Sequence, residues 1–227
     1  MKKFLLSIAL ILFTTSENSA HVDHYSKYNY LEYELFRNNK LIGYHKYKFK
    51  RKDNNLTINN EVKFKITKFG VDLYKYFAKG EERYSNGVFS GFTSTTNQNK
   101  KEKYVNISID KSDNNLIVDG SSYKGKASSD IIIGTWWNHE IAQKKAQISA
   151  VSGRIIKQKV TFVGKETIKI GEKSYKTLRF NFSSSDPSLS KDKKLNTDIW
   201  YEEDTYLWVK AAFDKTGYWE YRLKKVE

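Results

Sequence analysis

The alternation of apolar and polar side chains between residues 56 and 67 constrains this chain more than any other feature. Apolar residues occupy every second position except at Asn60, and polar or charged residues stand between them. The apolar positions are Leu56, Ile58, Val62, Phe64 and Ile66. Successive side chains of an extended strand point to opposite faces, so this period of two predicts a strand with one buried face and one face in water.

The same alternation recurs along most of the chain, at residues 105–109, 178–182, 207–213 and 219–223. Short segments rich in Asn, Asp and Gly separate such runs and are typical of hairpin turns. They are too short to contain the crossover helices that parallel strands require. We therefore expect an all-β fold: a strongly curved antiparallel meander sheet, or a partly open β-barrel, of about 11 to 13 strands.

One segment, residues 128–145, interrupts the alternation. It contains three consecutive isoleucines, the pair Trp136 and Trp137, and then Asn138. Asparagine is a favourable N-cap, and Ile141 is the apolar residue that a short helix here would bury. The segment predicts one short helical insertion of a turn or two, which lies across the sheet or plugs its open end.

The composition indicates a folded chain that is long enough for one domain. Its 227 residues have a mean hydropathy of −0.69, yet 15% of them are aromatic. Disordered segments are poor in aromatic residues, so this balance suits strands with one wet face. The chain has no cysteine, which excludes disulfides, thiolate zinc sites and a lipoprotein anchor. We expect residues 21–227 to form a single all-β domain.

Residues 1–20 have the three-part pattern of a secretory signal peptide. Two lysines follow the first Met, residues 4–13 form a nearly continuous apolar run, and small polar residues lead to Ala20. The run is shorter than the roughly 20 residues that a membrane-spanning helix needs. We expect a signal helix that is cleaved after Ala20, with Ser16 as the alternative, and a periplasmic or secreted product that is no longer a transmembrane protein.

The chain is basic, with 40 Lys and Arg against 26 Asp and Glu and a formal net charge of +14. Such a charge favours anionic surfaces, so an anionic envelope surface is a possible partner. A codon bias toward Lys and Asn explains the same composition without any partner. Arginine, whose forked donors phosphate and base recognition use, is scarce, and we expect no nucleic acid partner.

The motifs of familiar enzymes are missing or incomplete. His139 and Glu140 begin an H-E-x-x-H zinc motif, but Gln143 stands where the second histidine belongs. The sequence contains no G-x-S-x-G elbow, P-loop or dinucleotide fingerprint. His21 and His24 lie near the expected mature N-terminus, where a disordered tail is the simpler interpretation. We expect no metal, no cofactor and no assigned catalytic residue.

The acidic segment 198–204 supports one alternative, a hydrolase of envelope glycans or lipids. Asp198 and Glu202 share a strand face, and a glycosidase needs two carboxylates across a cleft. The simpler interpretation places Glu202 in a solvated turn. This alternative requires both carboxylates, together with His139, to converge in one cleft.

Five aromatic or histidine side chains are the candidate ligand-binding residues. Trp136, Trp137 and His139 lie in the irregular segment, where they could line a ligand mouth or fill the end of the barrel. Trp200 and Tyr201 are the aromatic pair of the acidic segment and complete the set.

Several short segments together resemble an uncharacterised family of exported bacterial proteins, a domain of unknown function. The matching pieces are Leu41-Ile42-Gly43-Tyr44-His45, Ser94-Thr95-Thr96-Asn97, Trp136, Asp198-Ile199-Trp200-Tyr201 and Gly217-Tyr218-Trp219-Glu220-Tyr221. The resemblance covers nearly the whole mature chain and implies an exported domain with a strongly curved antiparallel sheet. More loosely, the chain is similar to lipoprotein-carrier and lipocalin-like half-barrels. The resemblance implies no activity and no catalytic residues.

These observations favour an exported, non-enzymatic binding or envelope-associated domain. Its concave face or mouth would hold an apolar or amphipathic ligand, such as a lipid or an amphipathic small molecule.

Overall fold

The computed structural model describes residues 25–190 and 193–227. The predicted signal helix at residues 1–20 lies outside the described residues, as do both cleavage sites and the pair His21 and His24. Within the described part, no helix is long and apolar enough to cross a membrane.

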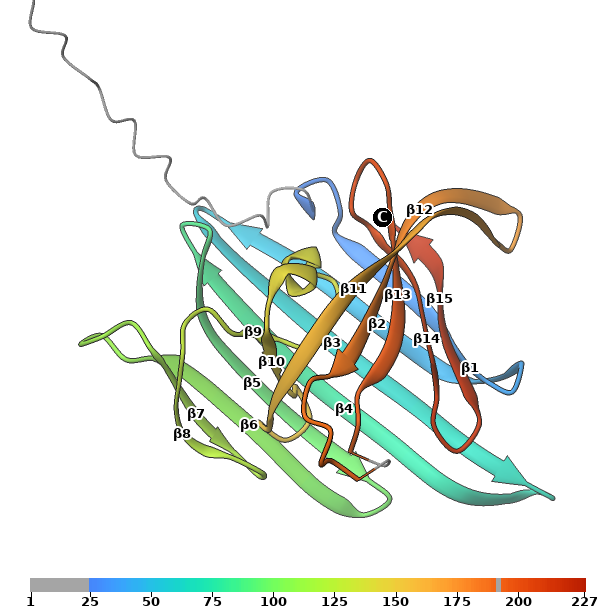
Figure 1. Ribbon diagram of the computed structural model, residues 1–227, viewed down its shortest axis with the longest axis horizontal. Helices are drawn as coiled ribbons and strands as arrows, with labels where there is room; N and C mark the ends of the chain where they lie inside the picture. Colours follow the sequence, from blue (N-terminus) through green and yellow to red (C-terminus); the bar gives the residue numbers. More distant parts are fainter. Residues whose placement is uncertain (1–24, 191–192) are drawn as a thin grey trace, which may run out of the picture.

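The described chain is almost entirely β-structure (Figure 1). The strands of its first half are β1 (Tyr30–Arg37), β2 (Lys40–Lys52), β3 (Asn55–Lys68), β4 (Val71–Ser85), β5 (Val88–Gln98), β6 (Lys101–Ile109), β7 (Leu116–Gly120) and β8 (Lys124–Ala127). Those of its second half are β9 (Ile132–Ile133), β10 (Ala146–Ile148), β11 (Ile155–Ile170), β12 (Lys173–Ser184), β13 (Asn196–Glu202), β14 (Trp208–Asp214) and β15 (Tyr218–Val226).

All of these strands belong to one 15-stranded sheet with the order β8-β7-β6-β5-β4-β3-β2-β1-β15-β14-β13-β12-β11-β10-β9. The first and last strands, β1 and β15, pair with each other in the middle of the sheet. Every described pair is antiparallel except β9 with β10. The sheet therefore consists of two halves, β1 to β8 and β9 to β15, which pair with each other through β1 and β15, and β8 and β9 are its edges. The sequence predicted fewer strands because strands of two to four residues carry no readable alternation.

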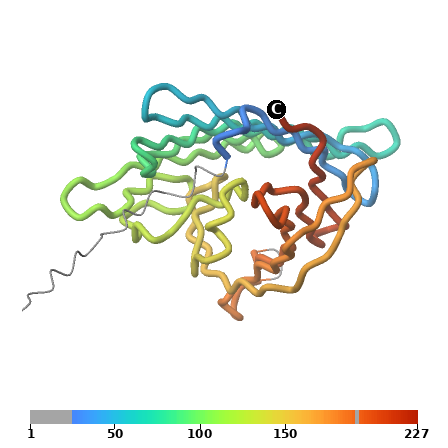
Figure 2. Tube along the Cα trace, turned by 90° about the horizontal axis from the view of Figure 1, so that it is seen from above, coloured from blue at the N-terminus to red at the C-terminus, as the bar shows by residue number. Residues whose placement is uncertain are grey.

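The sheet curls strongly without joining its edges (Figure 2). Strands β1 to β8 form one broad face, and β15 to β11 turn away from it and lead the chain back across its inner side. There Ser94 Oγ on β5 donates to the Ala150 carbonyl at 2.6 Å. A side chain at Gly120 would lie 2.7 Å from the Ser152 carbonyl oxygen, so glycine permits this close approach. The predicted all-β fold with a strongly curved, open sheet is confirmed.

The core occupies the inner side of the curled sheet. Its larger cluster is aromatic, and Tyr33 and Trp208 stack there with ring centroids 4.0 Å apart. The Tyr33 hydroxyl donates to the Trp208 carbonyl at 2.7 Å, which satisfies a buried polar group. The second cluster is aliphatic apart from one phenylalanine: Phe92, Val105, Ile107, Leu116, Val118, Ala127, Ile133 and Ile148. The alternating runs of the sequence supply both clusters.

The predicted helical insertion is present as a 3-10 helix, η2 (His139–Gln143). The Asn138 side chain caps it and accepts from the Glu140 backbone N–H at 3.0 Å. Ile141 is fully buried, as the sequence predicts. Residues 134–138 connect β9 to η2, which lies against the inner side of the sheet.

Candidate functional site

A cleft of about 440 Å³ opens at the end of the sheet where the β4–β5 and β6–β7 turns lie, and we call it the end cleft. Half of its lining residues are apolar: Val88, Phe89, Ile109, Leu116, Ile131, Ile132 and Ile133. Its polar lining consists of Glu82, Tyr84, Asn114, Ser129, Asn138, Glu140 and Lys144. This size lies within the range of small-molecule sites, which combine apolar walls with placed polar groups.

Local structure explains how the walls of the end cleft form. The turn between β4 and β5 uses Asn86 and Gly87, both with positive φ, and so places Phe89 directly beside Tyr84 and Val88 beside Ser85. On the other side, β9 pairs with β10, which buries Ile133 and leaves Ile132 half-buried at the sheet edge. An apolar edge strand therefore faces an apolar hairpin across the cleft.

A buried carboxyl group, that of Glu82 on β4, lies in the end cleft. It accepts hydrogen bonds from the Tyr84 hydroxyl at 2.5 Å, the Trp137 indole Nε1 at 3.0 Å and the Thr135 hydroxyl at 3.2 Å. Burial raises the pKa of Glu82, and the three donors offset this only in part. The cleft thus combines apolar walls with a hydrogen-bonding carboxyl group whose protonated form is favoured by its surroundings.

The structure brings four of the five predicted ligand-binding residues together next to the end cleft. The indole of Trp137 is fully buried behind Glu82. Trp136 packs on Trp208, and its carbonyl accepts from the Tyr201 hydroxyl at 2.9 Å. His139 stacks on the Tyr206 ring with centroids 4.4 Å apart. None of the five is among the residues that line the cleft, so their contact with a ligand stays a prediction.

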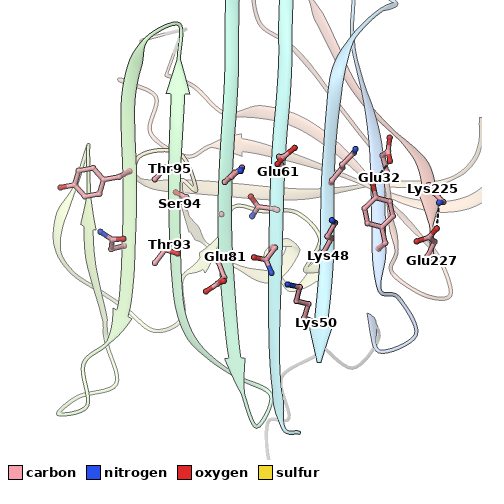
Figure 3. A pocket seen from close by; sticks show the side chains of 18 residues that line it. Glu32, Lys48, Lys50, Glu61, Glu81, Thr93, Ser94, Thr95, Lys225 and Glu227 are labelled. Carbon is pink, nitrogen blue, oxygen red and sulfur yellow. Dashed lines mark hydrogen bonds and ion pairs between the residues drawn. The ribbon is translucent and has the colours of Figure 1, made fainter. Parts of the chain in front are cut away.

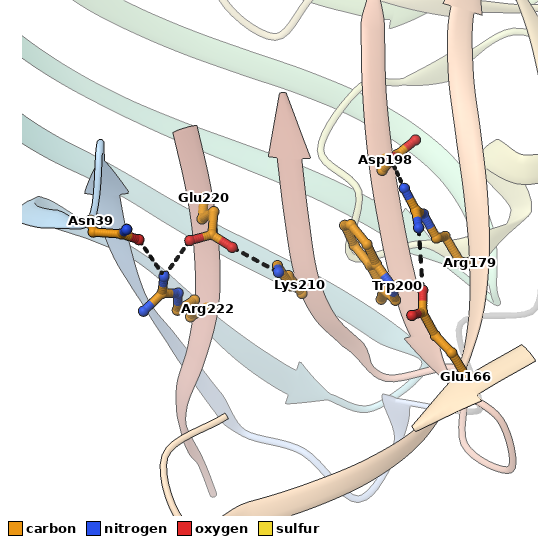
Figure 4. A network of polar contacts seen from close by, with 8 residues as sticks. All are labelled: Asn39, Glu166, Arg179, Asp198, Trp200, Lys210, Glu220 and Arg222. Carbon is orange, nitrogen blue, oxygen red and sulfur yellow. Dashed lines mark hydrogen bonds and ion pairs between the residues drawn. The ribbon is translucent and has the colours of Figure 1, made fainter. Parts of the chain in front are cut away.

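The fifth residue, Trp200, lies on the opposite face of β13 within a network of charges (Figure 4). Its indole Nε1 donates to Glu166 at 2.7 Å, and Arg179 and Lys210 each lie 4.9 Å from its ring centroid. Arg179 also forms an ion pair with Asp198 at 2.5 Å. These contacts cover Trp200, which is only 5% exposed, with a guanidinium and an ammonium group.

The two carboxylates of the hydrolase alternative have separate surroundings. Asp198 contacts Arg179 and accepts from Asn181 at 2.7 Å, whereas Glu202 accepts from the backbone N–H of Thr205 at 2.7 Å in the following turn. Four residues along one strand correspond to about 13 Å, beyond the carboxyl separation of glycosidases. Within the described residues, no group of three or more His, Asp or Glu side chains could hold a metal ion. The geometry offers no support for hydrolysis at this segment.

A second hollow of about 1000 Å³ extends across the outer face of β15 and β1 to β6 (Figure 3). Its charged groups have both signs: Lys46, Lys48, Lys50, Lys79 and Lys225 against Glu32, Glu61, Glu81 and Glu227. The tyrosines Tyr30 and Tyr44 donate to Glu32 and Glu61 at 2.6 and 2.7 Å. The residues that line this broad hollow are mostly charged or polar and lie on the wet side of the strands, whereas half of those that line the end cleft are apolar.

Sequence reasoning missed Glu82, although a signal for it exists. In β4 the residues with even numbers from Ala78 to Tyr84 are buried, and Glu82 is one of them. A carboxylate at an inward position of a strand requires hydrogen-bonding partners, which is a reason to suspect a site. The walls at Phe89 and Ile132 carry no such signal, because isolated apolar residues occur on every strand.

The open, curled sheet with a returning edge defines a β-barrel-like protein. A solved structure with a similar fold is the β-barrel-like protein of domain of unknown function DUF1849 from Brucella abortus. It has a TM-score of 0.58 and 10% sequence identity, over 87% of this chain and 96% of that one. This likeness concerns the fold alone.

The chain belongs to the family DUF6134, a domain of unknown function, whose model matches residues 33–224. The predicted resemblance to an uncharacterised family is thereby confirmed. No curated protein matches the chain significantly.

Proposed function

We propose that this protein is a non-enzymatic binding module that holds an amphipathic small molecule in the end cleft. One observation carries the proposal: a single cleft of about 440 Å³ is lined both by apolar side chains and by a buried carboxyl group. Burying an apolar group against such walls is favourable, at roughly 25 cal/mol per Å² of apolar surface removed from water. A ligand with one apolar part and one hydrogen-bonding group fits this lining.

The polar lining sets the chemistry of the ligand's other end. Glu82 and Asn138 are buried, whereas Glu140 and Lys144 are half-buried. A neutral donor or acceptor, such as a hydroxyl or an amide, suits the side of the cleft that Glu82 lines, because it leaves no unpaired charge there. A lipid or lipid-like molecule with a hydroxyl or amide group has this combination.

The binding proposal is tested with a cleft-filling variant. Ile131→Trp places an indole in the cleft and should weaken binding of the fluorescent amphiphile N-phenyl-1-naphthylamine by about tenfold or more. Val163→Trp is the matched control, because Val163 is exposed on β11 and does not line the cleft. Titration of probe fluorescence compares the two variants with the wild type. Equal binding by all three proteins would rule the end cleft out.

The export of the protein is a second part of the proposal. It rests on the basic and apolar pattern of residues 1–20. N-terminal sequencing of the protein recovered from periplasm or medium should begin at His21 or Glu17. Recovery of an unprocessed chain from the cytosol would contradict export and leave the cleft proposal intact.

A further inference from the structure

The β3–β4 hairpin extends beyond the rest of the sheet. The register of β3 with β2 ends at the pair Gly43 and Phe64, and that of β4 with β5 ends at Tyr76 and Gln98. Residues 66–74 therefore form a two-stranded ribbon whose strands pair with each other and with neither neighbour. The ribbon projects at the lower right of Figure 1 and at the right of Figure 2. Its tip reaches about 15 Å beyond Phe64 and Tyr76, the last residues that pair with the neighbouring strands β2 and β5.

Apolar side chains cover the tip of this ribbon. Phe69 is 92% exposed, Val71 61% and Leu73 53%. Monomeric proteins rarely gather exposed large apolar residues, and such a patch usually marks a site of interaction. Here the three side chains lie within five consecutive positions at the outermost point of a protrusion.

The turn itself contains an unfavourable residue. Phe69 has φ +51° and Gly70 has φ +79°, the left-handed pair of a type I′ turn, which favours Asn-Gly. The hairpin turns at Asn38, Asn86 and Asn99 have asparagine at the corresponding first position. A bulky residue is strained in the left-handed region, and its exposure adds a second cost. Turn formation therefore does not explain the phenylalanine.

Positive charge surrounds the apolar tip. Residues 63–77 contain Lys63, Lys65, Lys68 and Lys75 against the single carboxylate of Asp72, so their net charge is +3 (four minus one). Asp72 already forms ion pairs with Lys65 at 3.4 Å and Lys75 at 3.3 Å. Within the described residues, Lys63 and Lys68 have no carboxylate partner. Lys68, whose Nζ lies 5.3 Å from the centroid of the Phe69 ring, is thus available to an anionic partner at the tip, whereas Lys63 lies about 20 Å back along the strand.

The combination of a small apolar tip and unpaired lysines fits a lipid surface better than a protein. A stable protein interface buries about 800 Å² on each side, more than three side chains at a ribbon tip provide. A second copy of the same tip would bring like charges together. In an anionic bilayer, apolar side chains enter the interface to a depth of about 5–10 Å while lysines extend toward the headgroups. The ribbon is long enough for that depth.

We propose that the β3–β4 hairpin is a membrane-docking element that inserts Phe69, Val71 and Leu73 into the surface of an anionic bilayer. Lys68 contacts the lipid phosphates, and the other lysines of the hairpin add long-range attraction to the anionic surface. The tip lies at the opposite end of β4 from the end cleft, so docking does not depend on the ligand site. An anchored molecule would present the cleft away from the membrane that holds it.

Vesicle flotation of the mature protein tests this proposal. The protein should bind vesicles of equal parts phosphatidylcholine and phosphatidylglycerol, bind phosphatidylcholine vesicles weakly, and be released by high salt. Phe69→Asn should reduce binding by about tenfold or more while it keeps the melting temperature unchanged or raises it, because asparagine suits the turn. Val163→Asn, which removes an exposed apolar residue from β11, should bind as the wild type does.

A second variant reports insertion directly. Phe69→Trp keeps an aromatic residue at the tip, and its fluorescence should be quenched by phosphatidylglycerol with brominated acyl chains. Lys63→Gln with Lys68→Gln should remove much of the salt dependence. Failure of the wild type to float with anionic vesicles would overturn the proposal, as would undiminished flotation of Phe69→Asn. A dimer in sedimentation that Phe69→Asn dissociates would assign the tip to a second copy and overturn it as well.

Discussion

At the residue scale, His45 shows how the aromatic core treats a titratable group. It lies on β2 among rings, with the Tyr47 ring centroid 4.4 Å away and the Trp208 and Tyr221 centroids each 5.9 Å away. Its Nδ1 has no hydrogen-bond partner in the described part of the chain. Burial lowers the pKa of His45 to about 3, because a charged imidazolium would lose its hydration there.

This environment predicts acid sensitivity. The unfolded chain has a histidine pKa of about 6.5, so below that pH it binds a proton that the folded protein excludes. The free energy of unfolding should fall between pH 6.5 and pH 3 by as much as about 1.4 kcal/mol per pH unit from this residue. In His45→Phe this part of the decline should disappear, as measured by urea unfolding at pH 7 and pH 5. Parallel declines in both proteins would show that His45 is not the cause.

Glu82 predicts the opposite trend. Its folded pKa is raised, so the folded protein holds a proton that the unfolded chain releases above pH 4.5. Stability should therefore fall as pH rises through the folded pKa. Glu82→Gln resembles the protonated acid and should gain stability over the wild type at pH 8, with a smaller gain at pH 5. Glu81→Gln, one position away on the outer face, is the control for thermal unfolding at both pH values.

If Glu82→Gln and Glu81→Gln show the same pH dependence, the buried carboxyl of the end cleft is not the titrating group. That result would also remove the reason to expect a neutral polar group opposite Glu82 in a bound ligand.

At the element scale, the contact between β2 and β3 depends on a glycine. A Cβ atom at Gly43 would lie 2.0 Å from the Lys63 carbonyl oxygen and 2.5 Å from the Phe64 Cβ, distances at which the strands must separate. Gly43 is also part of the segment 41–45 that resembles the family. The close approach of β3 gives a steric reason for a glycine at this position. The position precedes the point where the β3–β4 hairpin leaves the sheet.

Gly43→Ala should therefore destabilise the protein by about 2 kcal/mol or more, which is a large effect for one added methyl group. Leu41→Ala, at an exposed position two residues earlier, should change stability by less than about 0.5 kcal/mol. Chemical denaturation of the two variants measures both values. A neutral Gly43→Ala would mean that the strands do not approach as closely as described.

Local patterns predicted the elements that local interactions determine. The Asn138 cap, the buried Ile141 and the turns at Asn38 and Asn86 follow from side-chain chemistry within a few residues, and the structure contains them. Strand β9 has two residues and no alternation, so its pairing with β10 depends on tertiary packing. The exposure of Phe69 could not be predicted from the sequence either, because a single apolar residue beside a glycine forms no recognisable pattern.

At the scale of the whole molecule, the pairing of β1 with β15 determines the architecture. It joins Leu31 to Val226 and Arg37 to Trp219, residues at opposite ends of the chain. No pattern within a window of sequence contains such a pairing, and this is why a simple meander was expected. The pairing places β8 and β9 at the edges and returns the β9 segment to the inner side of β4 to β7, where the end cleft forms.

The end cleft could be predicted only in part for the same reason. The irregular segment was expected to lie across the sheet or to plug its open end, and Trp137 was selected from it. The walls come from β4 to β7 and from β9, which are brought together by the curl of the entire sheet. The sequence therefore indicated where a site begins and left its opposite wall undetermined.

The most direct test of the account is a solution NMR titration of the mature protein with a lysophospholipid below its micelle concentration. We predict saturable shifts of the backbone amides of Val88, Phe89, Ile131 and Glu140, which line or border the end cleft. The Phe69→Asn variant, whose hairpin tip lacks the docking residue, should show the same shifts. Shifts that do not saturate, or that centre on residues far from the cleft in both proteins, would contradict the assignment of the end cleft as the ligand site.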